Sequence, residues 1–211
     1  MALSLDKGAV LWRQPEAAEL PETLKGRRAG STDGFAIVYD GIVIFRFGTN
    51  IAGLDTTDGR VVWSRPLVKA TDTYLYDGRY YVTTAAGKYH TLDPHTGAVL
   101  VSADLTKTLP AEIRKQRPSS WAPMLVSETH TFVGTRQGWL LAFERDTGVY
   151  AWSFRPRKGG EISHRSPGYF ASANGRFYYA DLSTCLYCLE EENPSDPVLI
   201  EERRRSQSSS S

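Results

Sequence analysis

A glycine followed four residues later by a large side chain recurs four times along this chain of 211 residues. The four pairs are Gly8/Trp12, Gly59/Trp63, Gly97/Val101 and Gly148/Trp152. An acidic residue stands four positions before the glycine in the last three copies, and a degenerate copy follows at residues 189–200. Self-similarity at a regular spacing is typical of repeat architectures, and it constrains the fold more strongly than any single residue.

Tight turns precede three of these copies. Asp40-Gly41, Asp77-Gly78 and Asn174-Gly175 each stand between apolar runs. Such pairs supply the positive φ angles that a type I′ hairpin turn requires. Each unit therefore predicts four antiparallel strands, joined by a hairpin turn, a short loop and an Asp/Gly turn. Four strands repeated in this way are typical of a β-propeller blade. The alternative, a β-sandwich with coincidental spacing, has to explain four aligned glycine pairs.

A longer period of 89 residues, the separation of Gly8 from Gly97 and of Gly59 from Gly148, lies over the blades. Residues 20–25 match residues 109–114 at the same offset. The chain thus predicts two copies of a two-blade unit, with long connectors at 13–33 and 102–120 before the first blade of each copy. A proline followed by helix-forming residues predicts a short helix in both connectors.

The pattern Leu-Asp-x-x-Thr-Gly-x-x-x-Trp, best preserved at residues 54–63, 92–101 and 147–152, resembles the pyrroloquinoline-quinone (PQQ)-like repeat. In that family the tryptophan docks between neighbouring blades, so Val101 and Ile200 imply weaker contacts in two places. The resemblance implies a structural, blade-docking set of residues, namely Gly8, Trp12, Gly59, Trp63, Gly97, Gly148 and Trp152. We assign the glycines to turns that need a flexible backbone. The family includes quinoprotein dehydrogenases, outer-membrane assembly scaffolds, sensor domains and bare binding modules, so the motif indicates fold rather than function.

The predicted fold is all-β, a small β-propeller of about four blades of four antiparallel strands with short helical connectors. It covers residues 1–202, and residues 203–211 form a polar tail that we expect to be disordered. A hydrophobic fraction of 41% supplies enough apolar surface for a core. Residues 8–12 supply one strand more than four blades need. Either residues 197–202 are not the last strand, or the chain is a fragment of a longer propeller, or the ring is open or partial.

Catalytic chemistry finds little support in the sequence. The acidic residues Asp55, Asp93 and Glu144 occupy repeat turns, where a carboxylate commonly stabilises the turn. Cys185 and Cys188 fall on one expected strand, where residues three apart point to opposite faces, so we predict neither metal binding nor a redox role for them. We therefore expect a protein that is not an enzyme and uses no cofactor. The alternative is a fragment or degenerate relative of a quinoprotein dehydrogenase.

Positive charge collects in the connectors between blades, whereas negative charge collects in the Asp/Gly turns. Connectors share one face of a propeller and these turns lie on the other, so the sequence predicts a basic and an acidic face. The alternative interpretation is that these charged residues simply lie on solvent-exposed loops and have no binding role. The predicted partner-binding face consists of Lys25, Arg27, Arg28, Arg114, Lys115, Arg117, Arg155, Arg157 and Lys158.

These observations predict a scaffold that binds a protein partner with an acidic surface, with self-association through open blade edges as a further possibility. Bare propellers of this kind are similar to some bacterial immunity proteins that neutralise a toxin, which suggests an inhibitory role. The net charge of +1 does not favour a nucleic acid partner. No apolar stretch approaches the ~20 residues of a membrane span, and the first residues do not read as a signal peptide, so we expect a cytoplasmic location. That the first residues do not read as a signal peptide also counts against an outer-membrane assembly-like scaffold.

Overall fold

Each half of the chain carries two four-stranded antiparallel sheets in the computed structural model. The structure describes residues 2–4, 6–7, 9–12, 36–47, 50–67, 69–119, 121, 123–155, 169–173, 176–180, 186–193 and 196–201. The chain forms two compact units, Met1–Asp104 and Leu105–Ser211. Two blades in each unit match the two-blade period of the sequence. Within the described residues, no helix has the length and apolar character needed to cross a membrane.

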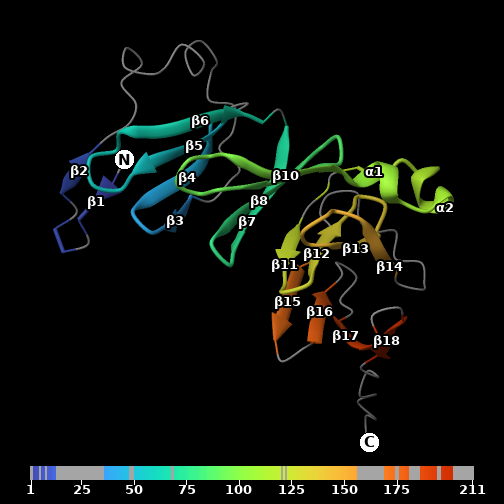
Figure 1. The fold of residues 1–211 in the computed structure, drawn as a ribbon. Coiled ribbons are helices and arrows are strands. Elements are labelled where there is room, and N and C mark those ends of the chain that lie inside the picture. The colour runs from blue at the N-terminus through green and yellow to red at the C-terminus, as the bar shows by residue number, and fades with distance from the viewer. Residues whose placement is uncertain are drawn as a thin grey trace, which may run out of the picture. The chain divides into compact units, whose positions relative to one another are not determined.

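The first unit begins with a two-stranded ribbon and continues with two blades (Figure 1). The ribbon pairs β1 (Ala2–Leu3) with β2 (Val10–Trp12), so two strands, not one, precede the first complete blade. The first blade is the meander β3 (Ile37–Tyr39), β4 (Ile42–Phe47), β5 (Asn50–Asp55) and β6 (Val61–Pro66). The second blade is β7 (Ala70–Tyr76), β8 (Arg79–Thr84), β9 (Lys88–Leu92) and β10 (Val99–Asp104).

The second unit contains two short helices and two blades. The helices are α1 (Leu105–Thr108) and α2 (Ala111–Arg114). The third blade is β11 (Met124–Val126), β12 (His130–Gly134), β13 (Leu140–Glu144) and β14 (Tyr150–Phe154). The fourth blade is β15 (Tyr169–Ala173), β16 (Arg176–Ala180), β17 (Leu186–Asn193) and β18 (Asp196–Glu201).

The structure bears on two predictions, one about the last strand and one about the helical connectors. Strand β18 pairs with β17, which removes the suggestion that residues 197–202 are not the last strand. No described sheet closes on itself, in keeping with the predicted blades. In the connector over 102–120, the described residues are helical only in α1 and α2, because β10 extends to Asp104 and Pro110 stands as the N-cap of α2. The matching connector at 13–33 and the tail at 203–211 lie outside the described residues.

The hairpin turns adopt the predicted backbone. Asp40 and Gly41 have φ angles of 40° and 79°, and Asp77 and Gly78 have φ angles of 49° and 66°. Positive φ at both central residues is the requirement of a type I′ turn, whose twist matches that of the flanking strands. The third predicted turn, at residues 174–175, lies outside the described residues. The two-residue spacing therefore fixes the β3–β4 and β7–β8 pairings.

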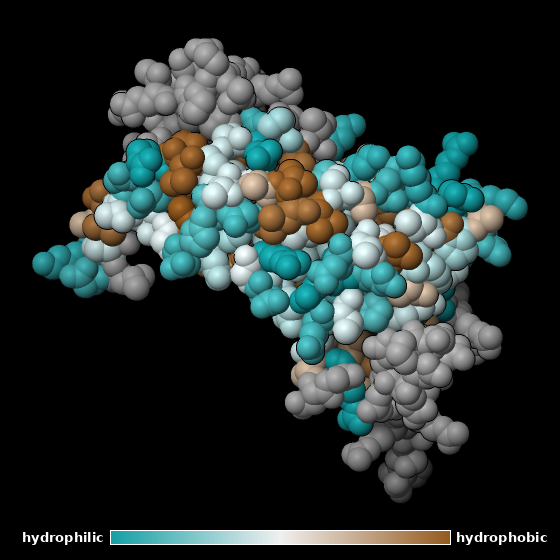
Figure 2. All heavy atoms as spheres, in the orientation of Figure 1, coloured by the Kyte–Doolittle hydropathy of each residue, from teal (hydrophilic) through white to brown (hydrophobic). Residues whose placement is uncertain are grey.

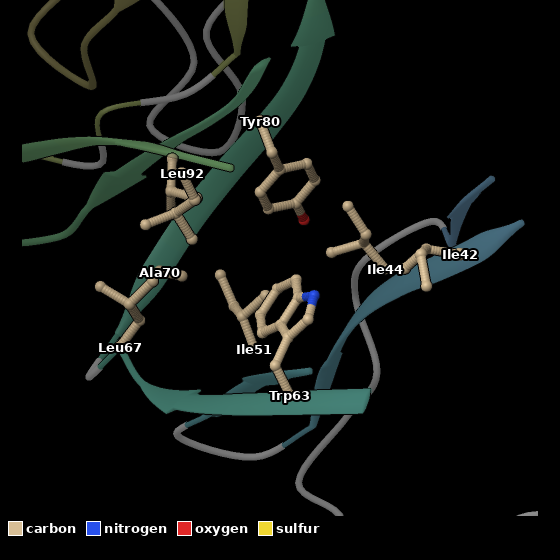
Figure 3. Close-up of a cluster of buried hydrophobic side chains, with 9 residues drawn as sticks. Ile42, Ile44, Ile51, Trp63, Leu67, Ala70, Tyr80 and Leu92 are labelled. Atoms are coloured by element: carbon tan, nitrogen blue, oxygen red, sulfur yellow. The ribbon is translucent and has the colours of Figure 1, made fainter. Parts of the chain in front are cut away.

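The tryptophan of the first blade joins the two sheets of the first unit. Figure 3 shows the indole of Trp63, carried by β6, pointing toward Tyr80 of the second blade. The same apolar cluster includes Ile44 from the first blade and Leu92 from the second. The indole Nε1 donates a hydrogen bond of 2.8 Å to the carbonyl oxygen of Pro94, in the β9–β10 turn. Trp63 thus docks between neighbouring blades, as the repeat predicts.

Two glycines make room for this indole. A Cβ atom at Gly53 would lie 2.3 Å from Nε1 of Trp63, and a Cβ atom at Gly97 would lie 2.5 Å from its Cε3 atom. Gly53 stands opposite Trp63 in the β5–β6 pairing, whereas Gly97 belongs to the Asp/Gly turn of the next blade. Gly97 also has a φ angle of 65°. Gly97 therefore has a second role beyond the turn: it gives Trp63 of the preceding blade a surface to pack on.

In the second unit, the arrangement around Trp152 is similar, but the residue opposite it and its hydrogen bonding differ from those of Trp63. Trp152 is buried and packs against Phe132, with ring centroids 5.7 Å apart. Phe132 in turn contacts Phe177 of the fourth blade at 4.4 Å. Ala142 stands opposite Trp152, where the first unit has a glycine, and Nε1 of Trp152 has no hydrogen-bond partner among the described residues. In the remaining docking set, Gly59 and Gly148 have φ angles of 75° and 69°, Gly8 lies outside the described residues, and only the backbone of residue 12 is described.

A series of glycine substitutions separates the two roles of glycine. Gly41→Ala should cost about 1 kcal/mol, because φ is 79° but nothing lies within 4 Å of the added Cβ. Gly53→Ala should cost about 1–3 kcal/mol through overpacking alone, and Gly97→Ala should cost the most because it meets both penalties. Urea unfolding measures these values. In a Trp63→Ala background, Gly53→Ala should be nearly neutral, because the indole that the new methyl group would meet is gone. If Gly53→Ala costs as much there as in the wild type, close packing of Gly53 on Trp63 is not the reason for its cost.

The tryptophans differ in what their ring nitrogen contributes. We expect Trp63→Ala and Trp152→Ala each to lower the free energy of unfolding by about 3–5 kcal/mol. Trp63→Phe should cost about 1–3 kcal/mol more than Trp152→Phe, because it leaves the buried carbonyl of Pro94 without its donor. Denaturant unfolding of both phenylalanine variants tests this, and equal losses would show that the hydrogen bond contributes nothing.

Candidate functional site

The turns between the second and third strands of two blades share one backbone design. In the β12–β13 turn, the amide N–H of Trp139 donates to Oγ1 of Thr135 at 3.1 Å, and Gly138 has a φ angle of 80°. In the β8–β9 turn, the amide N–H of Lys88 donates to Oγ1 of Thr84, also at 3.1 Å. The threonine hydroxyl thus closes the turn in both blades.

Each turn is also bonded to the connector that precedes its blade. The amide N–H of Arg136 donates to the carbonyl oxygen of Ser119 at 2.9 Å, and that of Ala85 donates to the carbonyl oxygen of Lys69 at 2.8 Å. Turn and connector therefore lie side by side at the same end of the blade. Residues in this turn belong to the same face as the connector residues.

The side chains on the two turns are very different. The second blade carries Ala85 and Ala86 and then Lys88, whereas the third blade carries an arginine, a glutamine and a tryptophan at residues 136, 137 and 139. Because the backbone is held by the threonine and the glycine, these larger side chains are not needed to form the turn. Their chemistry is available for another purpose.

Gln137 fastens the third blade's turn to its connector. Its Nε2 donates to the carbonyl oxygen of Arg117 at 3.0 Å and to Oγ of Ser119 at 3.1 Å, while its Oε1 accepts from the amide N–H of Ser119 at 3.0 Å. Arg117 has a φ angle of 50°, which is unusual for a residue with a side chain. Gln137 donates two hydrogen bonds and accepts one, and together they hold the connector in this conformation.

A second cluster forms around Trp139. Its Nε1 donates to Oε1 of Gln116 at 3.1 Å, and Nη1 of Arg155 donates to the same oxygen at 3.4 Å. The Arg155 guanidinium carbon lies 5.3 Å from the centroid of the Trp139 ring, a cation–π distance. Three segments of the chain, the end of α2, the β12–β13 turn and the end of β14, therefore converge at one point.

Five exposed cations lie on the segments that make these contacts. They form what we name the basic surface: Arg114, Lys115, Arg117, Arg136 and Arg155. None of the five forms an ion pair with a described residue. By contrast, Lys88 on the second blade pairs with Asp104 at 2.7 Å, so its charge is compensated. Figure 2 shows hydrophilic side chains over α1 and α2, where the basic surface begins.

The structure brings together part of the predicted face. Arg114, Lys115, Arg117 and Arg155 occupy the connector side of the third blade, while Lys25, Arg27, Arg28, Arg157 and Lys158 lie outside the described residues. The sequence reasoning missed Arg136, Trp139 and the glutamines at 116 and 137. The signal was available, because the turn between the second and third strands of a meander lies at the same end as the connectors.

The acidic turns have the structural role that the repeat predicts. Oδ1 of Asp93 accepts hydrogen bonds from the amide N–H groups of His95 and Thr96, at 2.9 and 2.8 Å. The backbone hydrogen bond from Thr96 lowers the pKa of Asp93, and that from Thr57 lowers the pKa of Asp55. These carboxylates are ionised caps of their own turns.

Two further features bear on the sequence-based expectations. Cys188 lies half-buried in β17, while Cys185 is outside the described residues, so the absence of a metal or redox role stays a prediction. No three His, Cys, Asp or Glu side chains of the described segments are grouped as a metal site. Exposed apolar side chains lie over β2, β6 and β10 (Figure 2), among them Leu11, Val62 and Leu100. They are compatible with self-association, which also stays a prediction.

The family model described as outer membrane protein assembly factor BamB matches residues 1–76 and 70–193. The chain belongs to this family of PQQ-like repeats. The match covers the four blades almost entirely. No curated protein sequence matches the chain.

Solved structures show the same fold in proteins of different function. BamB from Moraxella catarrhalis is 18% identical with a TM-score of 0.51, over 76% of this chain and 50% of that chain. Quinohemoprotein alcohol dehydrogenase from Comamonas testosteroni is 13% identical with a TM-score of 0.58, over 82% of this chain and 35% of that chain. The computationally designed Ika4 protein is 14% identical with a TM-score of 0.52, over 77% of this chain and 97% of that chain. The chain thus spans half of the BamB chain and about a third of the dehydrogenase.

The lowered pKa of Asp93 predicts how its contribution to stability depends on pH. A depressed pKa in the folded state contributes stability that is present above the unfolded value near ~3.9 and is lost as pH falls through the lower folded value. Asp93→Ala should therefore cost about 1 kcal/mol at pH 7, a modest value for a largely solvated turn, and progressively less below about pH 4. Urea unfolding between pH 2.5 and 7 measures the difference. Asp6→Ala, in the exposed β1–β2 turn, is the control, and a pH-independent loss for Asp93→Ala would contradict the assignment.

Proposed function

We propose that this protein is a non-catalytic propeller scaffold that binds a protein partner with an acidic surface, and that the basic surface of the third blade makes the contact. The observation that carries the proposal is a cluster of five exposed cations without a described ion-pair partner, on segments tied together by side-chain hydrogen bonds. Binding residues concentrate on loops held by a rigid scaffold.

Comparison of the two turns supports a role in binding rather than in folding. The second blade builds the same turn with two alanines and a lysine that Asp104 neutralises. The third blade keeps the turn and adds uncompensated charge and an indole. Uncompensated like charges repel one another, so their accumulation on one small surface lowers stability unless a partner of opposite charge is bound.

Electrostatic attraction of this kind predicts a definite kinetic behaviour. An acidic surface would be steered toward the basic surface, which raises the association rate at low ionic strength. Screening over about 10 Å at 0.1 M salt weakens that attraction. An inhibitory or immunity-type role, in which the scaffold neutralises its partner, is one form of this function, and a cytoplasmic partner is the one we expect.

The similar proteins represent the two functions under consideration, a binding scaffold and a quinoprotein enzyme. One is named as an outer membrane protein assembly factor, which describes protein assembly, and the other as a quinohemoprotein alcohol dehydrogenase. We favour the scaffold because the side chains on the third blade that are not needed to form its turn belong to a charged surface, which suits protein binding. Adding pyrroloquinoline quinone and Ca²⁺ and recording the absorption spectrum separates the two, since stoichiometric quinone binding would favour a degenerate quinoprotein.

Charge reversal of the basic surface should abolish partner capture. The test variant combines Arg114→Glu, Lys115→Glu and Arg136→Glu, and the control combines Lys7→Glu, Arg60→Glu and Arg176→Glu, which changes the net charge equally at exposed positions away from the connectors. In pull-downs from the native host at low salt, the control should retain the partner and the test variant should lose it. Circular dichroism verifies that both variants fold. A folded test variant that captures the partner as well as the wild type would refute the proposed function.

A further inference from the structure

We propose that Arg155 is a preorganised carboxylate-binding group, and that the basic surface takes an extended peptide segment rich in Asp and Glu. In this scheme Arg155 contacts the ligand, while Trp139 and Gln116 position it. The inference rests on the proposed function, because it names the chemistry of the partner at the same surface. It adds that the geometry of one guanidinium, and not charge alone, selects the ligand.

The position of Arg155 is fixed from two sides. The Trp139 ring supports the guanidinium at 5.3 Å, and Oε1 of Gln116 accepts from its Nη1 at 3.4 Å. Gln116 is itself held by the indole N–H of Trp139 at 3.1 Å. A guanidinium has five N–H donors in a planar fork, so one bond to Gln116 leaves donors for a carboxylate. Because the fork is already oriented, little side-chain entropy is lost when a carboxylate binds.

The backbone around the site argues against a phosphate cradle. Phosphate sites commonly use several free backbone N–H groups. Here the amide N–H groups of Arg136, Gly138, Trp139 and Ser119 all donate within the turn and connector. Side-chain cations are therefore the available donors, which suits separate carboxylates presented along a peptide.

The aromatic residue also differs from a base-stacking platform. Single-stranded nucleic acids are bound by stacking bases on open aromatic faces beside a basic groove. The Trp139 ring is half-buried, Arg155 lies over one of its faces, and its N–H is bonded to Gln116. Trp139 thus orients a cation instead of offering a free face, which favours an acidic peptide over a nucleic acid.

More than one carboxylate is needed to match the surface. Arg136 lies on the turn that Gln137 fastens to the connector, and Arg117 supplies the carbonyl that Gln137 binds. These two arginines therefore border the same turn as the Trp139 cluster, and both are exposed. A run of several acidic residues can engage Arg155 through its fork and the other cations by simple attraction.

Two conservative substitutions test the fork at Arg155. Arg155→Lys keeps the charge but removes the planar fork, and Gln116→Glu puts a carboxylate of the protein itself beside Arg155. The probe is a ten-residue peptide of alternating Glu and Ser, titrated calorimetrically into the full-length protein at low salt. Each variant should weaken the Kd by about 10-fold or more, the loss of one charge-assisted contact. The matched controls, Arg60→Lys and Lys7→Gln, should change the Kd less than about 2-fold.

The outcomes separate this inference from the proposed function. If the triple charge reversal abolishes peptide binding but Arg155→Lys and Gln116→Glu bind like the wild type, the fork is wrong and the scaffold function stands. If charge reversal leaves partner capture intact, the proposed function fails. An oligothymidylate of equal charge that binds as tightly as the peptide overturns the assignment to an acidic peptide. Far-ultraviolet circular dichroism and melting temperatures verify that every variant is folded.

Discussion

The joint between neighbouring blades depends on one indole that is clamped between two glycines. Gly53 on the tryptophan's own sheet and Gly97 on the next sheet approach Trp63 so closely that neither position has room for a methyl group. The hydrogen bond to Pro94 then fixes the depth of the ring. In the first unit, the Gly-x-x-x-Trp repeat thus joins two blades: the second blade offers Gly97 and the first blade offers Trp63. A dispersed apolar contact would not set the spacing of two sheets so closely.

The basic surface depends on a second kind of constraint, at the opposite end of the blade from the Asp/Gly turns. A threonine hydroxyl and a glycine with positive φ close the β12–β13 turn, and backbone hydrogen bonds hold it against the connector. The core and this turn are specified by different residues. Side chains on the turn can therefore vary without altering how blades pack, in keeping with the general rule that one fold can carry different functions.

The sequence predicts local features well and misses contacts between distant segments. The Asp40-Gly41 and Asp77-Gly78 turns follow from the two residues themselves, because few other pairs tolerate their φ angles. Strand β1 was missed, since two residues carry no periodicity. The charge runs locate Arg114 and Arg155, but nothing local indicates that Gln116 joins them through a tryptophan more than twenty positions away. Similarly, the packing role of Gly97 appears only when the neighbouring sheet is in place.

The shared design of the β8–β9 and β12–β13 turns has a consequence for the evolution of such chains. Duplication of a single blade would copy the turn framework along with the core, so each new blade would begin with a correctly shaped loop. Ala85 and Ala86 show how plain that loop can be. Changing three side chains on it alters the chemistry at the rim while every strand keeps its register. New recognition properties can thus arise one blade at a time, and an existing blade's specificity is left undisturbed while a second one is acquired.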